Sequence, residues 1–163
     1  MSLAICPGSF DPMTLGHLNI IRRTARIFDQ VVVVIMVNAG KKSPMFTLAE
    51  REDMARRVCE RFKNVRVESY DGMLAEFARK YEGSVVVKGL RANMDFENEF
   101  QMALINKKIN PRLETMFLTS SEKYTFLSSS VVKEMASYDA DLTEFIPREI
   151  LKDVTTKAKA GRT

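Results

Sequence analysis

Residues able to bind and neutralise phosphate recur in four loops of this 163-residue chain. The first loop, residues 7–17, contains Ser9 and ends at His17, the sole histidine of the sequence. Gly16 and His17 begin a helical pattern, and the free N–H groups and positive dipole of a helix start attract phosphate. A lone histidine there can also serve simply as a hydrogen-bonding residue. The loop lacks the G-x-G-x-x-G and Walker A spacings, which disfavours a dinucleotide dehydrogenase and a P-loop kinase.

Cations and hydroxyls follow three later strands. Lys41 and Lys42 lie after residues 31–37, where ammonium groups could contact phosphate or simply be solvated. The next loop reads Lys88-Gly89-Leu90-Arg91, in which cations flank a glycine that would let the backbone approach phosphate oxygens. Three serines begin a later helix, either as an N-cap or as a nest for phosphates: Ser128, Ser129 and Ser130.

Hydrophobic periodicity predicts that these loops share one edge of a sheet. Apolar and β-branched runs predict strands at residues 3–6, 31–37, 65–68, 84–87 and 115–119, with helical patterns between them. This alternation predicts an α/β fold: a single-domain, doubly wound, Rossmann-like five-stranded parallel sheet with helices on both faces. Ligands of such sheets bind outside the carboxyl ends of the strands, where the four loops lie.

The expected domain spans residues 1–163, with a C-terminal helix and a basic tail from about residue 147. Residues 152–163 are expected to form an exposed helix that frays into a disordered tail. The alternating residues 65–68 indicate an edge strand. A helix from about residue 95 is marked by Phe96, Phe100, Ala103 and Leu104.

Composition narrows the class of protein. Apolar residues make up 45% and charged residues 28%, enough for one sizeable core and against wholesale disorder. No apolar run approaches the ~20 residues of a membrane-spanning helix, and no secretory signal is evident, so a cytoplasmic location away from membranes is expected. The net charge of +4 suits a phosphate-bearing partner but is too mild to indicate nucleic acid. Cys6 and Cys59 lack zinc-like spacing and are expected to be buried thiols.

Several motifs resemble those of one family. Gly8-Ser9-Phe10-Asp11-Pro12 followed by Thr14-Leu15-Gly16-His17 is similar to the T/H-x-G-H signature with which nucleotidyltransferases grip ATP. Residues 127–133 resemble I-S-S-S-x-x-[RK], with leucine replacing isoleucine, and residues 88–91 resemble R-G-L-R, with Lys88 departing from it. In order and spacing, these motifs resemble those of bacterial phosphopantetheine adenylyltransferases over nearly the whole chain.

The resemblance implies a set of site residues. The catalytic residues would be His17, Lys41 and Arg91, where Lys41 matches the family lysine better than Lys42 does. The implied ATP contacts are Ser9, Phe10, His17, Gly89, Arg91, Glu99, Tyr124, Ser128, Ser129 and Ser130. The implied acceptor contacts are Ser9, Lys41, Met73, Leu74, Lys88, Met102 and Asn106. Glu134 could also contact the acceptor or lie on a solvated helix face. Because lysine lacks the bidentate fork of arginine, Lys88 is expected to give a looser phosphate clamp.

The resemblance also implies a reaction, which is reversible transfer of AMP from ATP to 4′-phosphopantetheine. Dephospho-coenzyme A and pyrophosphate would be the products, in coenzyme A biosynthesis. The acceptor phosphate is already an anion, so in-line attack without a covalent intermediate would need positioning and charge stabilisation rather than a general base. Further implications are Mg²⁺ bound mainly by phosphate and water, a homohexamer, and feedback inhibition by coenzyme A.

Two alternatives stay open. A related nucleotidyltransferase could act on nicotinate mononucleotide or, with CTP, on glycerol phosphate, although residues 88–91 and 95–101 favour phosphopantetheine. A non-catalytic module that binds nucleotides or nucleic acid would need a continuous cationic patch with interleaved exposed aromatics. The cations of this chain are instead expected in separate loops at one sheet edge, which suits a compact ligand.

Overall fold

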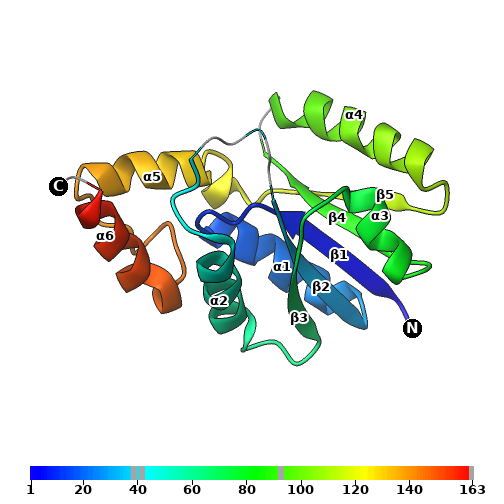
Figure 1. Cartoon of the computed structure of the whole chain (residues 1–163), viewed down its shortest axis with the longest axis horizontal. Helices are drawn as coiled ribbons and strands as arrows, with labels where there is room; N and C mark the ends of the chain where they lie inside the picture. The colour runs from blue at the N-terminus through cyan, green and yellow to red at the C-terminus, as the bar shows by residue number, and fades with distance from the viewer. Residues whose placement is uncertain (38–39, 41–42, 92–93, 162–163) are drawn as a thin grey trace.

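A five-stranded parallel sheet forms the centre of the computed structural model, which describes residues 1–37, 40, 43–91 and 94–161 (Figure 1). The strands lie in the order β3-β2-β1-β4-β5. Their bounds are Leu3–Gly8 for β1, Gln30–Met36 for β2, Val65–Tyr70 for β3, Val85–Leu90 for β4 and Glu114–Thr119 for β5. This order confirms the doubly wound α/β fold and puts β3 at an edge.

Helices connect the strands and extend the chain beyond β5. The α-helices are α1 Leu15–Ile27, α2 Leu48–Cys59, α3 Leu74–Phe77, α4 Met94–Ile109, α5 Ser129–Ser137 and α6 Leu151–Ala160. Short 3₁₀ turns lie at Ala78–Lys80, Glu122–Tyr124 and Arg148–Ile150. Helix α2 begins with a capping box, in which Thr47 and Glu50 exchange side-chain and backbone hydrogen bonds. No described helix is both long and apolar enough to cross a membrane.

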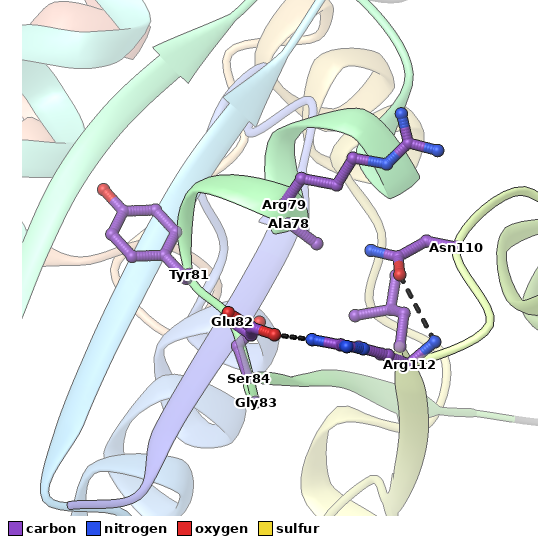
Figure 2. A pocket seen from close by; sticks show the side chains of 9 residues that line it. Ala78, Arg79, Tyr81, Glu82, Gly83, Ser84, Asn110 and Arg112 are labelled. Carbon is purple, nitrogen blue, oxygen red and sulfur yellow. Dashed lines mark hydrogen bonds and ion pairs between the residues drawn. The ribbon is translucent and has the colours of Figure 1, made fainter.

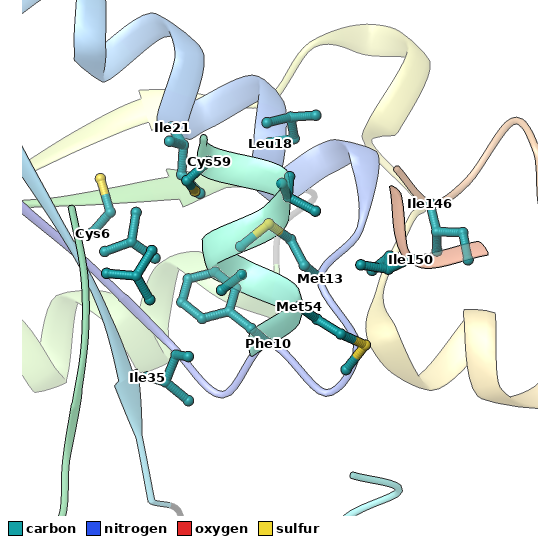
Figure 3. Close-up of a cluster of buried hydrophobic side chains, with 14 of the residues drawn as sticks. Cys6, Phe10, Met13, Leu18, Ile21, Ile35, Met54, Cys59, Ile146 and Ile150 are labelled. Carbon is teal, nitrogen blue, oxygen red and sulfur yellow. The ribbon is translucent and has the colours of Figure 1, made fainter. Parts of the chain in front are cut away.

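The sheet separates two hydrophobic clusters, because successive strand residues point to opposite faces. On one face, Ala4, Cys6 and Val33 pack with buried residues of α1, α2, α5 and α6. On the other face, Ile5, Val32 and Val34 pack with α3 and the 3₁₀ turn after it. Figure 3 shows the larger cluster, in which Phe10 and Met13 of the first loop lie beside Met54 of α2. The first loop is therefore anchored in the core.

One sequence-based expectation about the helices was wrong, while the helix expected from about residue 95 is confirmed as α4. The last helix is not simply exposed, because Val154 is fully buried and Arg57 of α2 donates to Asp153 at 2.8 Å. In α4, two of the apolar residues that mark the helix, Phe96 and Leu104, are 50% and 56% exposed. The apolar side chains of α4 lie around the helix rather than along one face. Some of them therefore pack inward, and others face outward.

Candidate functional site

A crevice opens where β1 and β4 separate. The pairing of these strands covers Ala4↔Val85 and Ile5↔Val86, whereas β4 and β5 pair from Val85↔Glu114 to Leu90↔Thr119. The chain leaves β1 towards β2 on one side, while β4 begins the opposite half of the sheet. Such a reversal of strand order is the switch point at which ligands of doubly wound sheets bind.

Two cavities lie at this crevice and share a wall. The smaller, about 170 Å³, is lined by residues that include Phe10, Thr14, His17, Gly89, Arg91, Tyr124 and Leu127. The larger, about 480 Å³, is lined by residues that include Ser9, Gly40, Met73, Leu74, Met102 and Asn106. Pro7, Gly8, Lys88 and Glu99 line both cavities. Most residues predicted to contact ATP thus border the smaller cavity, and the described residues predicted to contact the acceptor border the larger one.

His17 is held in a defined orientation at the start of α1. The Nδ1 atom of its ring accepts a hydrogen bond from the backbone N–H of Thr14 at 2.9 Å. The backbone N–H of His17 in turn donates to the Thr14 hydroxyl at 3.3 Å. An acceptor Nδ1 carries no proton, so the neutral ring carries its proton on Nε2. The ring also meets Phe10 edge to face, with centroids 5.1 Å apart. These contacts make Nε2 the atom of His17 that can donate to a ligand.

Core contacts of Phe10 and a hydrogen bond from Arg51 fix the turn before His17. Phe10 has a left-handed backbone conformation, with φ of 46°, and its side chain is 5% exposed. The buried Arg51 of α2 donates to the Ser9 carbonyl at 2.9 Å. Phe10 lines the smaller cavity and packs against the His17 ring, while Ser9 lines the larger cavity.

An ion pair occupies the wall between the cavities. Lys88 of β4 and Glu99 of α4 approach to 3.1 Å, and both side chains are about three-quarters buried, with 26% and 28% exposed. A phosphate that binds Lys88 therefore competes with the Glu99 carboxylate. Sequence reasoning gave Glu99 as an ATP contact and did not foresee this pair.

Gly89 has a packing role in addition to the one expected from the sequence. A Cβ atom at this position would lie 2.8 Å from Cγ1 of Ile20, closer than real Cβ atoms approach other atoms. Glycine at this point thus lets helix α1 pack against β4. Gly89 also lines the smaller cavity, and its expected role in letting the backbone approach phosphate stays a prediction.

The loops after β4 and β5 are tied together beside the smaller cavity. The guanidinium of Arg91 donates to the Leu127 carbonyl at 2.8 Å. Tyr124 is half-buried, and its Cβ lies 3.5 Å from where a Cβ of Gly16 would be. The cation predicted to bind phosphate thus also positions the segment that leads into α5.

The three serines divide their roles at the start of α5. Ser128 is the N-cap, and its hydroxyl accepts from the N–H of Val131 at 3.2 Å. The Ser129 hydroxyl donates to the Pro12 carbonyl at 2.8 Å, and Ser130 is exposed. None of these serines is among the lining residues of the two cavities. Their predicted contact with ATP phosphates stays a prediction.

The larger cavity gathers residues from distant parts of the chain. Met73 and Leu74 come from the start of α3, while Met102 and the buried Asn106 come from α4. Gly40 lies on the same cavity, but its neighbours Lys41 and Lys42 lie outside the described residues. Glu134 is exposed on α5 and does not line either cavity.

Sequence reasoning gave no individual roles to Asp11, Thr14 and Arg51, which organise the first loop. A usable signal existed for Arg51, because positions 51, 54, 55 and 58 share the buried face of α2. An arginine on a buried apolar face needs a specific partner, which is the Ser9 carbonyl. For Thr14, the T-x-x-H spacing could have indicated the capping box with His17.

A buried thiol lines the site, and the described residues form no side-chain metal cluster. Cys6 lines the smaller cavity, but burial raises the pKa of its thiol to about 12, so it stays protonated near neutral pH. Across the described ranges, no group of three or more His, Cys, Asp or Glu residues is arranged to hold a metal ion. The site therefore offers hydrogen-bond donors, cations and an apolar groove.

Another hollow lies away from these loops (Figure 2). It has a volume of about 240 Å³ and is lined by Ala78, Arg79, Tyr81, Glu82, Gly83, Ser84, Asn110, Arg112 and Leu113. These residues precede β4 and β5, so the hollow lies at the amino ends of the strands. Its arginines already have partners, since Arg112 pairs with Glu82 and Arg79 donates to the Ile109 carbonyl. The hollow is thus separate from the switch-point site.

Comparison with known proteins agrees with the geometry. The sequence profile described as cytidylyltransferase-like matches residues 5–135. A phosphopantetheine adenylyltransferase of Caldanaerobacter subterraneus subsp. tengcongensis is 47% identical over 159 residues, which cover 98% of this chain and 99% of the relative. Its counterpart from Finegoldia magna is 48% identical over 148 residues, covering 91% of each chain.

Solved structures show the same architecture at low identity. A bifunctional NMN adenylyltransferase/ADP ribose pyrophosphatase from Francisella tularensis has a TM-score of 0.70 at 12% identity and covers 99% of this chain and 50% of that chain. A proposed nicotinate-nucleotide adenylyltransferase from Vibrio parahaemolyticus has a TM-score of 0.67 at 18% identity, covering 94% and 99%. At such identities these two structures support the fold alone.

Proposed function

The chain belongs to the phosphopantetheine adenylyltransferases, and from this premise we propose that it transfers AMP reversibly from ATP to 4′-phosphopantetheine. The products are dephospho-coenzyme A and pyrophosphate, in the synthesis of coenzyme A. The observation that carries the proposal is the pair of cavities with a common cationic wall. One cavity suits a nucleotide and the other a long, partly apolar acceptor, and their reacting phosphates would meet at Lys88.

The apolar lining of the larger cavity supports the choice of acceptor. Met73, Leu74 and Met102 offer flexible, apolar contacts that suit the extended pantetheine arm. Asn106 adds an amide that could pair with one of the amide groups of that arm. Glycerol phosphate would leave much of a cavity of about 480 Å³ unfilled. Nicotinate mononucleotide is about as large as 4′-phosphopantetheine, but it would place a ribose and a carboxylate against this apolar lining.

Chemistry at this site would rest on alignment and charge stabilisation. The acceptor phosphate is already an anion, so its in-line attack on the α-phosphorus needs no general base. The Nε2–H of His17 would donate to the α-phosphate as negative charge builds in the transition state. Lys88 and Arg91 would offset the charge of the crowded phosphates, as would Lys41 from the acceptor side.

The departing pyrophosphate would lie at the start of α5. The Ser129 hydroxyl donates its hydrogen bond to the Pro12 carbonyl. The Ser128 hydroxyl accepts one from the N–H of Val131, so its own proton could be donated to a ligand. Ser128, Ser130 and the first N–H groups of α5 would therefore contribute most of the hydrogen bonds to pyrophosphate.

Magnesium would enter with ATP as part of the substrate. Mg²⁺ commonly keeps several waters and binds through the phosphates of a nucleotide rather than through a protein cage. The described part of the site fits this mode, because it presents cations and hydroxyls instead of a cluster of carboxylates.

A homohexamer in the cytoplasm, inhibited by coenzyme A, completes the proposal. Support for assembly comes from the outward face of α4, where Phe96 and Phe100 stack with centroids 5.6 Å apart and are 50% and 48% exposed. Apolar patches of this kind commonly mark protein interfaces. Coenzyme A contains the pantetheine arm, so it would compete for the larger cavity. A solution mass of six chains, and inhibition by coenzyme A that added 4′-phosphopantetheine relieves, would support these parts.

The direct test is release of pyrophosphate from purified protein with ATP, Mg²⁺ and 4′-phosphopantetheine. Omission of the acceptor is the matched control, and mass spectrometry identifies dephospho-coenzyme A. CTP in place of ATP, and nicotinate mononucleotide or glycerol phosphate as the acceptor, test the related reactions. Turnover confined to one of those combinations would overturn the assigned substrates, even if folded protein still bound ATP.

A further inference from the structure

Asp11 lies at a point where three segments of the site meet. Its carboxylate is 1% exposed and accepts hydrogen bonds from the backbone N–H groups of Met45, at 3.0 Å, and Phe46, at 2.9 Å. The ammonium of Lys133 on α5 lies 2.5 Å from the same carboxylate. The three donors come from parts of the chain that are 34, 35 and 122 residues away from Asp11.

Each of these segments carries residues predicted to bind a different part of the substrates. Asp11 itself lies in the loop between Ser9 and His17. Met45 and Phe46 end the loop that begins on the larger cavity at Gly40. Lys133 lies one turn into α5, and the Ser129 hydroxyl adds a second link from that helix to the Pro12 carbonyl. Asp11 therefore connects the acceptor side, the α-phosphate side and the pyrophosphate side.

The chemistry of the cluster requires a carboxylate. All three partners of Asp11 are donors, and both carboxylate oxygens are acceptors. An asparagine amide would turn its NH₂ group towards at least one of these donors. A buried charge is tolerated when it is paired and hydrogen-bonded, and Lys133 together with the two N–H groups meets that condition.

We propose that Asp11 is a positioning residue that fixes the acceptor-side loop and α5 relative to the His17 loop. The inference rests on the proposed function, because in-line transfer requires the two substrates to be aligned. Asp11 is too deeply buried beneath the loops to touch the reacting phosphates. Its effect is transmitted through Met45, Phe46 and Lys133.

The consequence is a loss of turnover that exceeds the loss of binding. A displacement of about 1 Å at a reacting centre can cost on the order of 10²-fold in rate. Each substrate keeps most of its own contacts when the loops shift slightly, so ATP affinity falls much less than kcat. A residue that only stabilises the fold would lower the melting temperature without changing kcat per folded site.

The experiment compares Asp11→Asn with Asp153→Asn in the full chain. Asp153 also bridges two elements, since it accepts from Arg57 of α2 at 2.8 Å, but it lies away from both cavities. Turnover per ATP-binding site, the ATP dissociation constant from calorimetry and the melting temperature are measured for each variant. Hydrogen exchange of the Met45 and Phe46 amides provides a readout that does not depend on activity.

We expect Asp11→Asn to lower kcat about 10- to 100-fold, while the ATP dissociation constant changes less than about threefold. Exchange at Met45 and Phe46 should accelerate in this variant alone. Asp153→Asn should lose thermal stability but keep kcat within about twofold of wild type, because its ion pair supports α6 rather than the site. If Asp11→Asn does not fold, the double variant with Lys133→Met removes both charges and should show the same loss of kcat.

Two results would overturn the inference. In one, Asp11→Asn retains wild-type kcat per site and loses only thermal stability, which makes Asp11 purely structural. In the other, ATP affinity falls as much as kcat/KM, which makes Asp11 a determinant of binding. Wild-type protein that transfers no AMP to 4′-phosphopantetheine would refute the proposed function instead. The inference would then be decided by whether exchange at Met45 and Phe46 accelerates.

Discussion

Replacing His17 by asparagine should separate its two hydrogen-bonding roles. The Nδ1 atom accepts from the Thr14 N–H at 2.9 Å, and Nε2 carries the proton that would donate to the α-phosphate in the proposed reaction. Asparagine places an acceptor oxygen as far along the side chain as Nδ1 and has no group that reaches the position of Nε2. His17→Asn therefore keeps the cap and loses the donor, whereas His17→Ala loses both.

The two variants should differ in stability and agree in turnover. Loss of the bond to Thr14 costs about 0.5–1.5 kcal/mol, and loss of the edge-to-face contact with Phe10 costs about as much again. The unfolding free energy should thus fall by about 1–3 kcal/mol in His17→Ala, and by about half of that in His17→Asn, which loses only the ring contact. By analogy with removal of one oxyanion donor, kcat should fall about 10²–10³-fold in both variants.

Urea unfolding at equilibrium and acceptor-dependent pyrophosphate release measure these two effects on the same preparations. Near-normal turnover of His17→Asn would show that Nε2 does not donate in the transition state. Equal destabilisation by asparagine and alanine would instead show that the acceptor role of Nδ1 contributes nothing to the fold. Either result would refute the assignment of tautomer and role derived from the Thr14 contact.

Three further predictions follow from packing and protonation. Gly89→Ala should destabilise the fold by about 1–3 kcal/mol in urea unfolding, because its Cβ would meet Ile20 at 2.8 Å. Adding Ile20→Ala should then cost less than the two single changes predict, and strict additivity would contradict the packing role. Burial raises the pKa of both cysteine thiols to about 12, so Ellman's reagent should modify neither in native protein and both in urea. Lys157, which donates to Glu50, lowers the pKa of that carboxyl, so its stabilisation is present at neutral pH and lost as pH falls. Wild type should therefore be more stable than Glu50→Gln at pH 7 and equal to it in acid, whereas a difference independent of pH would exclude the charge interaction.

The hydrophobic periodicity of the sequence determined the strands and helices of the fold. The apolar run of residues 31–37 and the alternation of residues 65–68 became strands β2 and β3, as predicted. These features depend on neighbouring residues and on strand or helix periodicity, which a sequence displays directly. The same alternation placed the loops predicted to bind phosphate at one sheet edge, because parallel strands end on the same side.

Side-chain roles in the loops were only partly predictable. The motif spacing identified His17, Arg91 and the serines as a group, but not that Ser129 would bond Pro12 or that Arg91 would bond Leu127. Likewise, the apolar residues of α4 predicted a helix without predicting which of them face outward. Apolar residues lie around this helix rather than along one stripe, so periodicity could not select its inner face.

Tertiary structure alone decided which groups meet. Lys88 pairs with Glu99 across two elements, and Lys133 reaches Asp11 over 122 residues of sequence. Such contacts depend on how far helices and loops lie from one another after packing, and local patterns carry no record of those distances. The sequence by itself determined the fold, the family and the loops predicted to form the site, while the packed structure determined which residues line the two cavities and which hold the others in place.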